Sequence, residues 1–333
     1  AGTVLVKDIN LGGDGSGISE MINLNGMLIF GAYEQSTGYE LWKSDGTEAG
    51  TTILKNINSA EFSSFPSSFV IFNNKVIFSA DDGIHGNEPW VTDGTESGTA
   101  LIIDINLGVL SSDAQYYKTC GSKIFFVAYN STIGFELWKT DGTAAGTVLV
   151  KDINIGSSSS NIEFMDVLNN ILLFKANNNS LVTQLWRTDG TEAGTVIVKI
   201  INPSGDPNIQ KTDIAIIDGV LYFKANNGVN GLELWRTDGT EAGTYMVKDI
   251  FTGPNSSGIT FLNVLNNKIY FAAKNLEYGY ELWVSDGTES GTTLLKDTIP
   301  GYSDSDFSMI IVLNGVLFLG LYSEQYDFEL FII

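Results

Sequence analysis

The stretch Glu40-Leu41-Trp42-Lys43-Ser44-Asp45-Gly46-Thr47, followed by Ala49-Gly50-Thr51, returns along the chain at nearly constant intervals. Its aspartate is Asp45, Asp93, Asp141, Asp189, Asp238 and Asp286, so the successive spacings are 48, 48, 48, 49 and 48 residues. All six tryptophans precede these aspartates by three residues: Trp42, Trp90, Trp138, Trp186, Trp235 and Trp283. A period of this length indicates an array of repeated structural units.

Each repeat contains short runs in which apolar and polar residues alternate, as strands require. In the second repeat we expect strands at 69–72, 75–80, 88–92 and 99–104, labelled A to D. Pairs such as Asn25-Gly26 and Asn73-Asn74 tolerate the positive φ of tight hairpins and fall between strands A and B. Seven such four-stranded antiparallel meanders predict an all-β, seven-bladed β-propeller, with residues 1–333 as a single domain. An open solenoid is the alternative, and it would need distinct polar caps.

The two ends of the chain both fall inside a repeat. The Gly-Thr pair that precedes strand D occurs first at Gly2, and Phe328-Glu329-Leu330-Phe331 matches residues 39–42. We therefore expect residues 1–10 to complete the last blade, with residues 3–9 as the strand that joins three strands from 306–333. Such a junction would close the ring and remove an exposed sheet edge.

The segment Glu-Leu-Trp-x-Ser/Thr-Asp-Gly-Thr-x-x-Gly-Thr resembles the ELWxxDGT repeat family of bacterial secreted and surface proteins, and the resemblance covers almost the whole chain. It implies propeller-like repeats and an extracellular or cell-surface location, with a signal peptide already removed. It does not imply a particular ligand. Pro89, Gln184 and Phe331 depart from the pattern at the positions of Leu, Glu and Trp.

Composition excludes several classes of function. The chain carries 18 Lys and Arg against 39 Asp and Glu, a formal charge of −21, which disfavours binding to nucleic acid. One cysteine and one histidine exclude intrachain disulfides and Cys-rich or multi-His metal sites. No apolar run approaches the ~20 residues of a membrane span, so we expect no membrane insertion. Cys120 stands where other repeats carry Leu24 or Phe72, and we expect it to be buried.

The recurring residues are best explained by a task that every blade performs. We expect the tryptophans to pack between adjacent sheets, with each indole N–H on a backbone carbonyl; a set of sugar-stacking platforms is the alternative. The recurring aspartate is expected to accept backbone N–H groups of its own turn. A regular hairpin would place Ser44 opposite Thr51 and Glu40 opposite the oppositely charged Lys55. The same register predicts the pairs Glu136–Lys151, Glu233–Lys248, Glu281–Lys296 and Glu329–Lys7.

Ligand binding is expected on the D–A and B–C loops, which emerge at one end of the sheets and vary between repeats. The candidate ligand-binding residues on these loops are acidic: Asp14, Glu34, Asp304 and Asp306. The second repeat adds Asp81, Asp82, His85 and Glu88, which together could bind a divalent cation such as Ca²⁺. The alternative is that these charges only keep the protein soluble.

Asn130, Asn178 and Asn255 begin Asn-x-Ser/Thr sequences and are candidate glycosylation sites if the protein passes through a eukaryotic secretory pathway. The function expected from the whole pattern is a non-enzymatic interaction module that binds a protein or a glycan at a cell surface. A carbohydrate-binding propeller is one alternative. A calcium-dependent hydrolase that uses Asp81, Asp82 and Glu88 is another.

Overall fold

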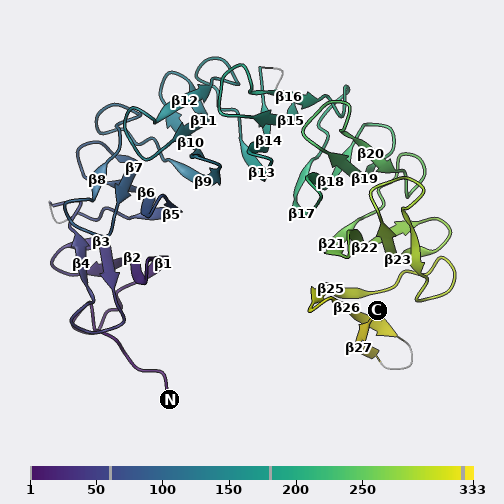
Figure 1. Cartoon of the computed structure of the whole chain (residues 1–333), viewed down its shortest axis with the longest axis horizontal. Helices are drawn as coiled ribbons and strands as arrows, with labels where there is room; N and C mark the ends of the chain where they lie inside the picture. The colour runs from purple at the N-terminus through teal and green to yellow at the C-terminus, as the bar shows by residue number, and fades with distance from the viewer. Residues whose placement is uncertain (1, 60–61, 180–181, 324–326) are drawn as a thin grey trace. The chain divides into compact units, whose positions relative to one another are not determined.

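The computed structural model describes residues 2–59, 62–179, 182–323 and 327–333. The chain is all-β and contains six four-stranded sheets and one three-stranded sheet, each an antiparallel meander in chain order. The predicted fold class, seven consecutive blades of a β-propeller, is confirmed (Figure 1). No helix in these residues could cross a membrane.

The strands of the first three sheets are β1 (Ser19–Leu24), β2 (Met27–Glu34), β3 (Gly38–Ser44), β4 (Thr52–Lys55); β5 (Ser67–Phe72), β6 (Lys75–Asp81), β7 (Asn87–Thr92), β8 (Ala100–Leu101); β9 (Gln115–Cys120), β10 (Lys123–Asn130), β11 (Gly134–Thr140) and β12 (Val148–Lys151). Those of the next two are β13 (Glu163–Leu168), β14 (Ile171–Asn177), β15 (Thr183–Thr188), β16 (Val196–Lys199); β17 (Gln210–Ile217), β18 (Val220–Asn226), β19 (Leu232–Thr237) and β20 (Tyr245–Lys248). The last two contain β21 (Thr260–Leu265), β22 (Lys268–Asn275), β23 (Gly279–Ser285), β24 (Thr293–Lys296); β25 (Phe307–Leu313), β26 (Val316–Ser323) and β27 (Asp327–Ile332).

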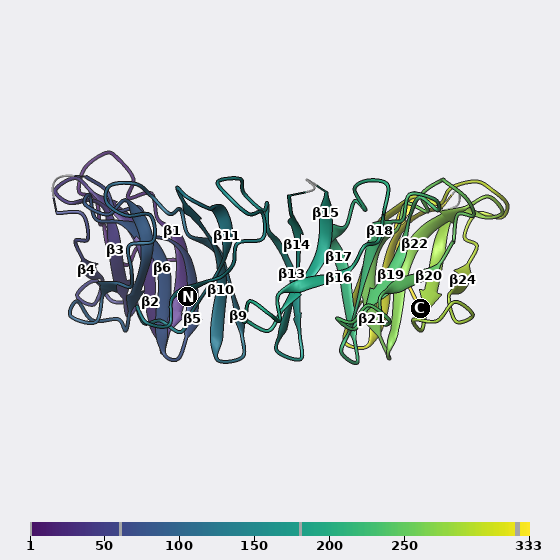
Figure 2. The same ribbon diagram turned by 90° about the horizontal axis from the view of Figure 1, so that it is seen from above.

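The chain divides into two compact units. Residues 1–162 with 190–192 form the first unit, and residues 163–189 with 193–333 form the second. In both units the two ends of the strands carry the hairpin turns and loops, as the view in Figure 2 shows. Each repeat of about 48 residues therefore forms one sheet.

Burial follows the alternation in the sequence. In the first unit, Leu41 and Leu54 of the first sheet pack with Phe78 and Trp90 of the second in one cluster. Trp90, Trp235 and Trp283 each pack in a cluster with residues of the preceding sheet, which confirms the predicted packing between sheets for these three. Trp42 and Trp186 are also buried, while Trp138 is partly exposed. The prediction that each indole N–H meets a backbone carbonyl is wrong: among the described residues only the Trp283 indole donates to one, that of Ala273 at 3.1 Å. The indole nitrogens of Trp42, Trp90, Trp138, Trp186 and Trp235 are buried without a hydrogen-bond partner among the described residues.

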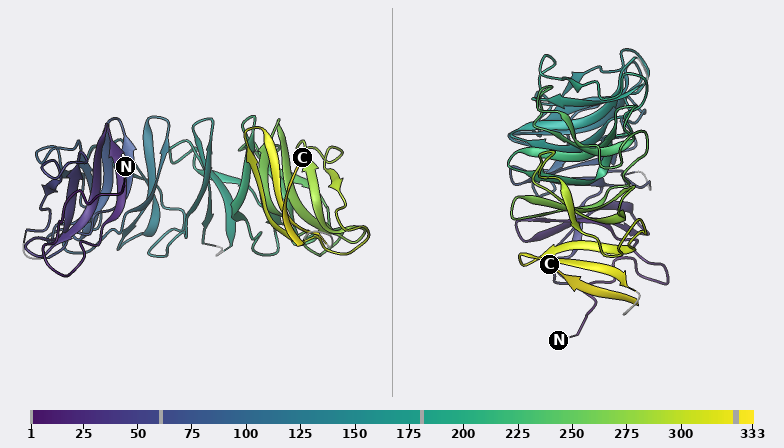
Figure 3. Two further views of the ribbon diagram at one scale, coloured as in Figure 1. Left: turned by 90° about the horizontal axis from the view of Figure 1, so that it is seen from below. Right: turned by 90° about the vertical axis from the view of Figure 1, so that its right-hand side faces the viewer.

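The predicted fourth strand of the last sheet is not found. Residues 2–8 form no strand, and the sheet of β25, β26 and β27, yellow in Figure 3, has three strands in the described part of the chain. The segment instead keeps the side-chain contacts that a fourth strand makes with the sheet that follows it. Lys7 Nζ donates to the Thr51 carbonyl at 2.8 Å, as Lys55 Nζ does to Thr99 at 2.9 Å. Within residues 3–9, Val4 and Leu5 are 79% and 80% exposed, and Ile9 packs with Phe30 and Trp42 of the first sheet.

The predicted Glu–Lys pairs are also wrong. A β-bulge lies between Leu41 and Trp42, and it places Lys55 opposite Leu41 instead of Glu40. The same bulge places Lys151, Lys248 and Lys296 opposite leucines. Nearer the turn the predicted register holds, because Ser44 Oγ lies 2.7 Å from Thr51 Oγ1.

Candidate ligand-binding face

The D–A loops are held at their bases by the recurring glutamate. Glu88 is fully buried and accepts the backbone N–H groups of Ile105 at 3.0 Å, Asn106 at 3.3 Å and Ser112 at 2.9 Å. Its carboxylate therefore joins the two ends of the loop that leads into the third sheet. Glu40, Glu136, Glu233 and Glu281 are also fully buried and hydrogen-bond to the corresponding loop segments.

Burial has the largest effect on the pKa of these carboxylates, and it raises that pKa. It raises the pKa of Glu88 from its ordinary value to about 7, although the hydrogen bonds from Ile105 and Ser112 oppose the rise. Burial likewise raises the pKa values of Glu40, Glu136 and Glu233 to about 7. A carboxylate in this environment is a structural anchor, since the residues that donate hydrogen bonds to Glu88 in the described part of the chain all belong to the loop that follows β8.

The opposite end of each sheet carries the recurring Asp-Gly-Thr turn. Asp45 Oδ1 accepts the Thr47 N–H at 2.9 Å and the Thr47 hydroxyl at 2.7 Å, which confirms the predicted capping role. These bonds lower the pKa of Asp45, and equivalent bonds lower those of Asp93, Asp141, Asp238 and Asp286. Gly46 adopts a φ of +89°, and a Cβ on Gly50 would lie 2.0 Å from Asp45 Oδ1. The sequence of this end is therefore set by the turn itself.

The D–A and B–C loops differ from these turns in exposing large apolar side chains. In the first unit these are Leu11, Phe62, Phe65, Ile84, Leu107, Val109, Leu110 and Ile155. In the second unit they are Val229, Leu276 and Tyr302. Leu107 and Val109 are 79% and 77% exposed although they are neighbours in one loop. Clustered exposed apolar groups are typical of interaction surfaces, and acidity, the signal used in the sequence, did not identify them.

The acidic group in the second repeat does not form a metal site. Asp82 accepts the N–H groups of Ile84 and His85, and its Oδ2 lies 2.8 Å from His85 Nδ1. Asp81 accepts the Gly83 N–H at 2.6 Å, and Glu88 is buried in its loop anchor. Partial burial alone would raise the pKa of Asp82, but the His85 hydrogen bonds outweigh it and lower that pKa. Conversely, Asp82 raises the pKa of His85.

The remaining predicted acids are spread over separate loops. Asp14 and Asp306 are exposed, Glu34 accepts the Thr37 hydroxyl at 3.4 Å, and Asp304 forms an ion pair with Lys274 at 2.7 Å. Across the described ranges, no group of three or more His, Cys, Asp or Glu side chains could hold a metal ion. Of the residues expected to bind calcium, Asp82 and His85 are therefore in contact, but the described residues do not form a group of three or more that could hold the ion.

The candidate glycosylation sites differ in their surroundings. Asn130 is engaged in its loop, because its Nδ2 donates to the Ile105 carbonyl at 2.8 Å and its Oδ1 accepts the Thr132 N–H at 3.0 Å. Asn255 is exposed. Asn178 is partly exposed, but the Ser180 of its sequence lies outside the described residues. Cys120 is buried as predicted, and burial raises its pKa.

The second unit contains a polar pocket that the sequence analysis did not predict. Its volume is about 330 Å³, and it is lined by Glu163, Lys175, Thr183, Asp206, Asn208, Ile209, Gln210, Lys211 and Thr212. Lys175 Nζ lies 3.3 Å from Glu163 Oε1, and Lys211 Nζ lies 3.2 Å from Glu163 Oε2. Partial burial alone would raise the pKa of Glu163, but the two lysines lower it. These residues belong to the D–A loop end of β13, β14, β15 and β17.

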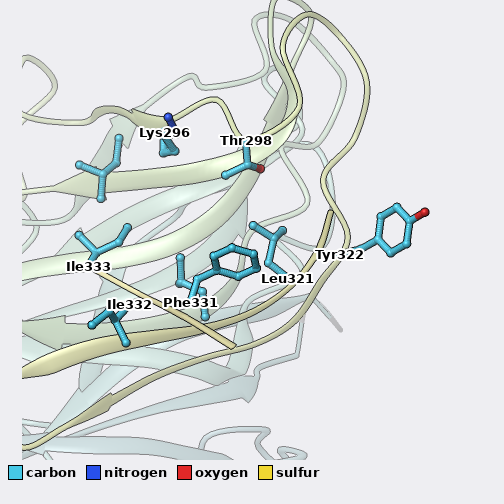
Figure 4. Close-up of a pocket in the computed structure, with 9 residues that line it drawn as sticks. Lys296, Thr298, Leu321, Tyr322, Phe331, Ile332 and Ile333 are labelled. Atoms are coloured by element: carbon cyan, nitrogen blue, oxygen red, sulfur yellow. The ribbon is translucent and has the colours of Figure 1, made fainter. Parts of the chain in front are cut away.

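A larger apolar pocket of about 470 Å³ lies between β24, β26 and β27 in the second unit. Phe331, Leu321 and Ile333 line it, while Tyr322 points away from it, as Figure 4 shows. β27 has no strand on its outer side among the described residues, and Leu330 is 61% exposed. The pocket therefore belongs to an unpaired sheet edge rather than to the loop end.

Comparison with known proteins adds likeness of fold only. No family model and no curated protein matches the chain. Similar solved structures include an oligopeptidase B from Leishmania major (TM-score 0.46, 11% identity, 95% of this chain and 48% of that one). A structure from a study of two prolyl endopeptidases gives a TM-score of 0.45 and 10% identity, over 95% of this chain and 49% of that one. A puromycin hydrolase gives 0.41 and 14%, over 90% and 49%. The chain thus spans about half the length of these proteins.

Proposed function

We propose that this protein is a non-enzymatic interaction module, extracellular or displayed at a cell surface, that binds a protein partner through its D–A and B–C loops. The observation that carries the proposal is the contrast between the two ends of the sheets. One end exposes leucine, valine and phenylalanine side chains at loop tips, and the other consists of repeated Asp-Gly-Thr turns. The extracellular location rests on the resemblance to the ELWxxDGT repeat family.

The loops are suited to recognition because their bases are fixed while their tips vary. In the loop between β8 and β9, Glu88 binds Ile105, Asn106 and Ser112, whereas the tip residues Leu107, Val109 and Leu110 point into solvent. A loop whose conformation is already fixed loses little conformational entropy on binding. Exposed apolar side chains that become buried against a partner contribute to the free energy of association. Acidic neighbours would favour a partner with basic residues around an apolar centre.

The proposal is tested by the combined variant Leu107→Ser, Val109→Ser and Leu110→Ser. The wild-type protein, immobilised, should retain a surface or extracellular protein of the source organism, and the purified partner should bind the wild type directly. The loop variant should reduce that affinity about ten-fold or more, because several anchors are lost. Val148→Ser is the matched control, since Val148 is exposed at the opposite end, at the start of β12. Equal binding by the loop variant and the control would refute the proposal.

A further inference from the structure

The polar pocket of the second unit is built at positions where this repeat departs from the others. The first two strands of a sheet meet at its loop end in a cross-strand pair, which is Ser19 with Gly31, Ser67 with Ser79, Gln115 with Val127, Gln210 with Lys224, Thr260 with Ala272 and Phe307 with Leu321. In the sheet of β13 this pair is Glu163 with Lys175, both charged. Lys211 from β17 joins the same carboxylate. The lysine recurs in the next sheet, where Lys224 contacts Asp213 at 2.9 Å and donates to the Ile259 carbonyl, as Lys175 donates to the Ile209 carbonyl at 2.9 Å. The feature particular to this pocket is therefore Glu163, which is held by two lysines at once.

The pocket retains unused hydrogen-bonding capacity of both kinds. An ammonium group has three N–H donors and a carboxylate about four acceptor sites. Within the described ranges Lys211 donates to Glu163 alone, so two of its N–H groups remain available. Asp206 Oδ1 accepts the Asn208 N–H at 2.7 Å, while its Oδ2 has no protein partner among the same residues. Thr183 uses its proton on Asn177 Oδ1 at 2.8 Å and can still accept a hydrogen bond.

The charges that line the pocket balance. Lys175 and Lys211 contribute two positive charges, and Glu163 and Asp206 contribute two negative ones. An anion would meet the two carboxylates and a cation the two lysines, so neither gains a net attraction. A neutral ligand whose hydroxyl groups both donate and accept hydrogen bonds uses both sets. Ile209 is buried in the core, and its carbonyl oxygen accepts a hydrogen bond from Lys175 Nζ at 2.9 Å, which fixes that lysine at the pocket.

We propose that this pocket binds a neutral hexose unit of a glycan. The volume of about 330 Å³ lies near the lower end of the usual range for ligand pockets, ~300–1,000 Å³, which suits one or two sugar rings. The proposal goes beyond the proposed function, since it assigns the same loop end a second ligand of a different class, held by other residues.

The test is a titration of the full chain with maltose, cellobiose and lactose, followed by saturation-transfer NMR and calorimetry, with glucuronate and glucosamine as charged comparisons. At least one neutral disaccharide should bind. Lys211→Met should weaken it about ten-fold or more, because a charged hydrogen bond is lost. The same variant leaves the pocket with one excess negative charge and should shift preference toward glucosamine, whereas Asp206→Asn should shift it toward glucuronate. A purely structural role would produce neither shift.

Lys274→Met is the matched control, because Lys274 forms an exposed ion pair with Asp304 elsewhere in the same unit. It should leave sugar binding unchanged. Absence of binding to all three disaccharides, or equal loss in the Lys211 and Lys274 variants, would overturn the proposal. Preference of the wild type for glucuronate or glucosamine over every neutral sugar would also overturn it. None of these outcomes bears on the protein partner, whose capture depends on Leu107, Val109 and Leu110.

Discussion

Removal of the buried carboxylate of Glu88 should destabilise the second sheet and release the loop that follows it. Glu88→Ala leaves the N–H groups of Ile105, Asn106 and Ser112 without their acceptor, in a place that water does not reach. A buried group left unsatisfied costs about 1–3 kcal/mol. Three such groups, with partial relaxation of the loop, give an expected loss of about 3–6 kcal/mol, a large part of the ~5–15 kcal/mol that stabilises most proteins.

Urea unfolding followed by circular dichroism measures the global loss, and hydrogen exchange at the amides of residues 105, 106 and 112 measures the local one. Both are needed because repeated sheets can unfold separately. Glu96→Ala is the control, since Glu96 is exposed in the same repeat and removes the same charge. If the two variants unfold at the same urea concentration and residues 105, 106 and 112 keep their protection in Glu88→Ala, the anchoring role of this carboxylate is wrong.

Three further predictions follow from the same contacts. The pKa of Glu40, Glu88, Glu136 and Glu233 rises to about 7 in the folded protein, so the folded state binds more protons than the unfolded state between the ordinary pKa of a glutamate, ~4.3, and about 7. The free energy of unfolding should therefore fall as pH rises through that window, by up to about 1.4 kcal/mol per pH unit for each group. Thermal melting at a series of pH values measures this, and Glu88→Gln should make the pH dependence shallower. Gly50→Ala should cost about 1–3 kcal/mol in urea unfolding, because its Cβ would overlap the Asp45 carboxylate, whereas Gly2→Ala, with open space around it, should cost far less. Lys7→Met removes the bond to the Thr51 carbonyl and should speed proteolysis within residues 2–8, with Lys118→Met as a comparison that leaves this segment unchanged.

The features that the sequence predicts well are those fixed by neighbouring residues. Strands and A–B turns follow from alternation and from residues such as Asn73 and Asn74, which adopt φ values of 50° and 58°. The Asp-Gly-Thr turn is local in the same sense, because Asp45 binds Thr47 within the turn. The burial of Cys120 follows from the apolar residues at its position in other repeats. In each case the partners lie within a few residues or within one repeat.

The role of the recurring glutamate could not be derived from pairing rules. Opposite charges across a hairpin attract, but the bulge after Leu41 moves Lys55 away from Glu40. The actual partners of Glu40 include the N–H groups of Ile57 and Ser64, which lie 17 and 24 residues further along. Because every residue except proline has a backbone N–H group, the residue type does not reveal which of these groups donates to the glutamate. A serine placed 24 residues after the glutamate, as in Ser64, Ser112, Ser160, Ser257 and Ser305, was the available signal.

The residues proposed to bind ligands were harder still to predict. Charge alone directed attention to Asp81, Asp82 and His85, whose hydrogen bonds prove to lie largely within their own loop. The polar pocket combines Glu163, Lys175 and Lys211, and it depends on the contact of two successive sheets in the second unit. Departure of one repeat from the others at several positions was the informative signal, because a residue that every sheet shares already has a structural task.

The buried glutamates also explain why the loop tips can vary so freely. A surface loop normally risks losing its conformation when its residues change, because its own side chains hold it. Here the hydrogen bonds that fix the loop after β8 come from Glu88, which belongs to β7, and they end on backbone atoms that every residue except proline provides. Leu107, Val109 and Leu110 can therefore change without loss of the anchor. The pKa of this buried carboxylate is raised in several sheets. The same glutamate therefore fixes the conformation of the loop and makes the stability of the protein depend on pH.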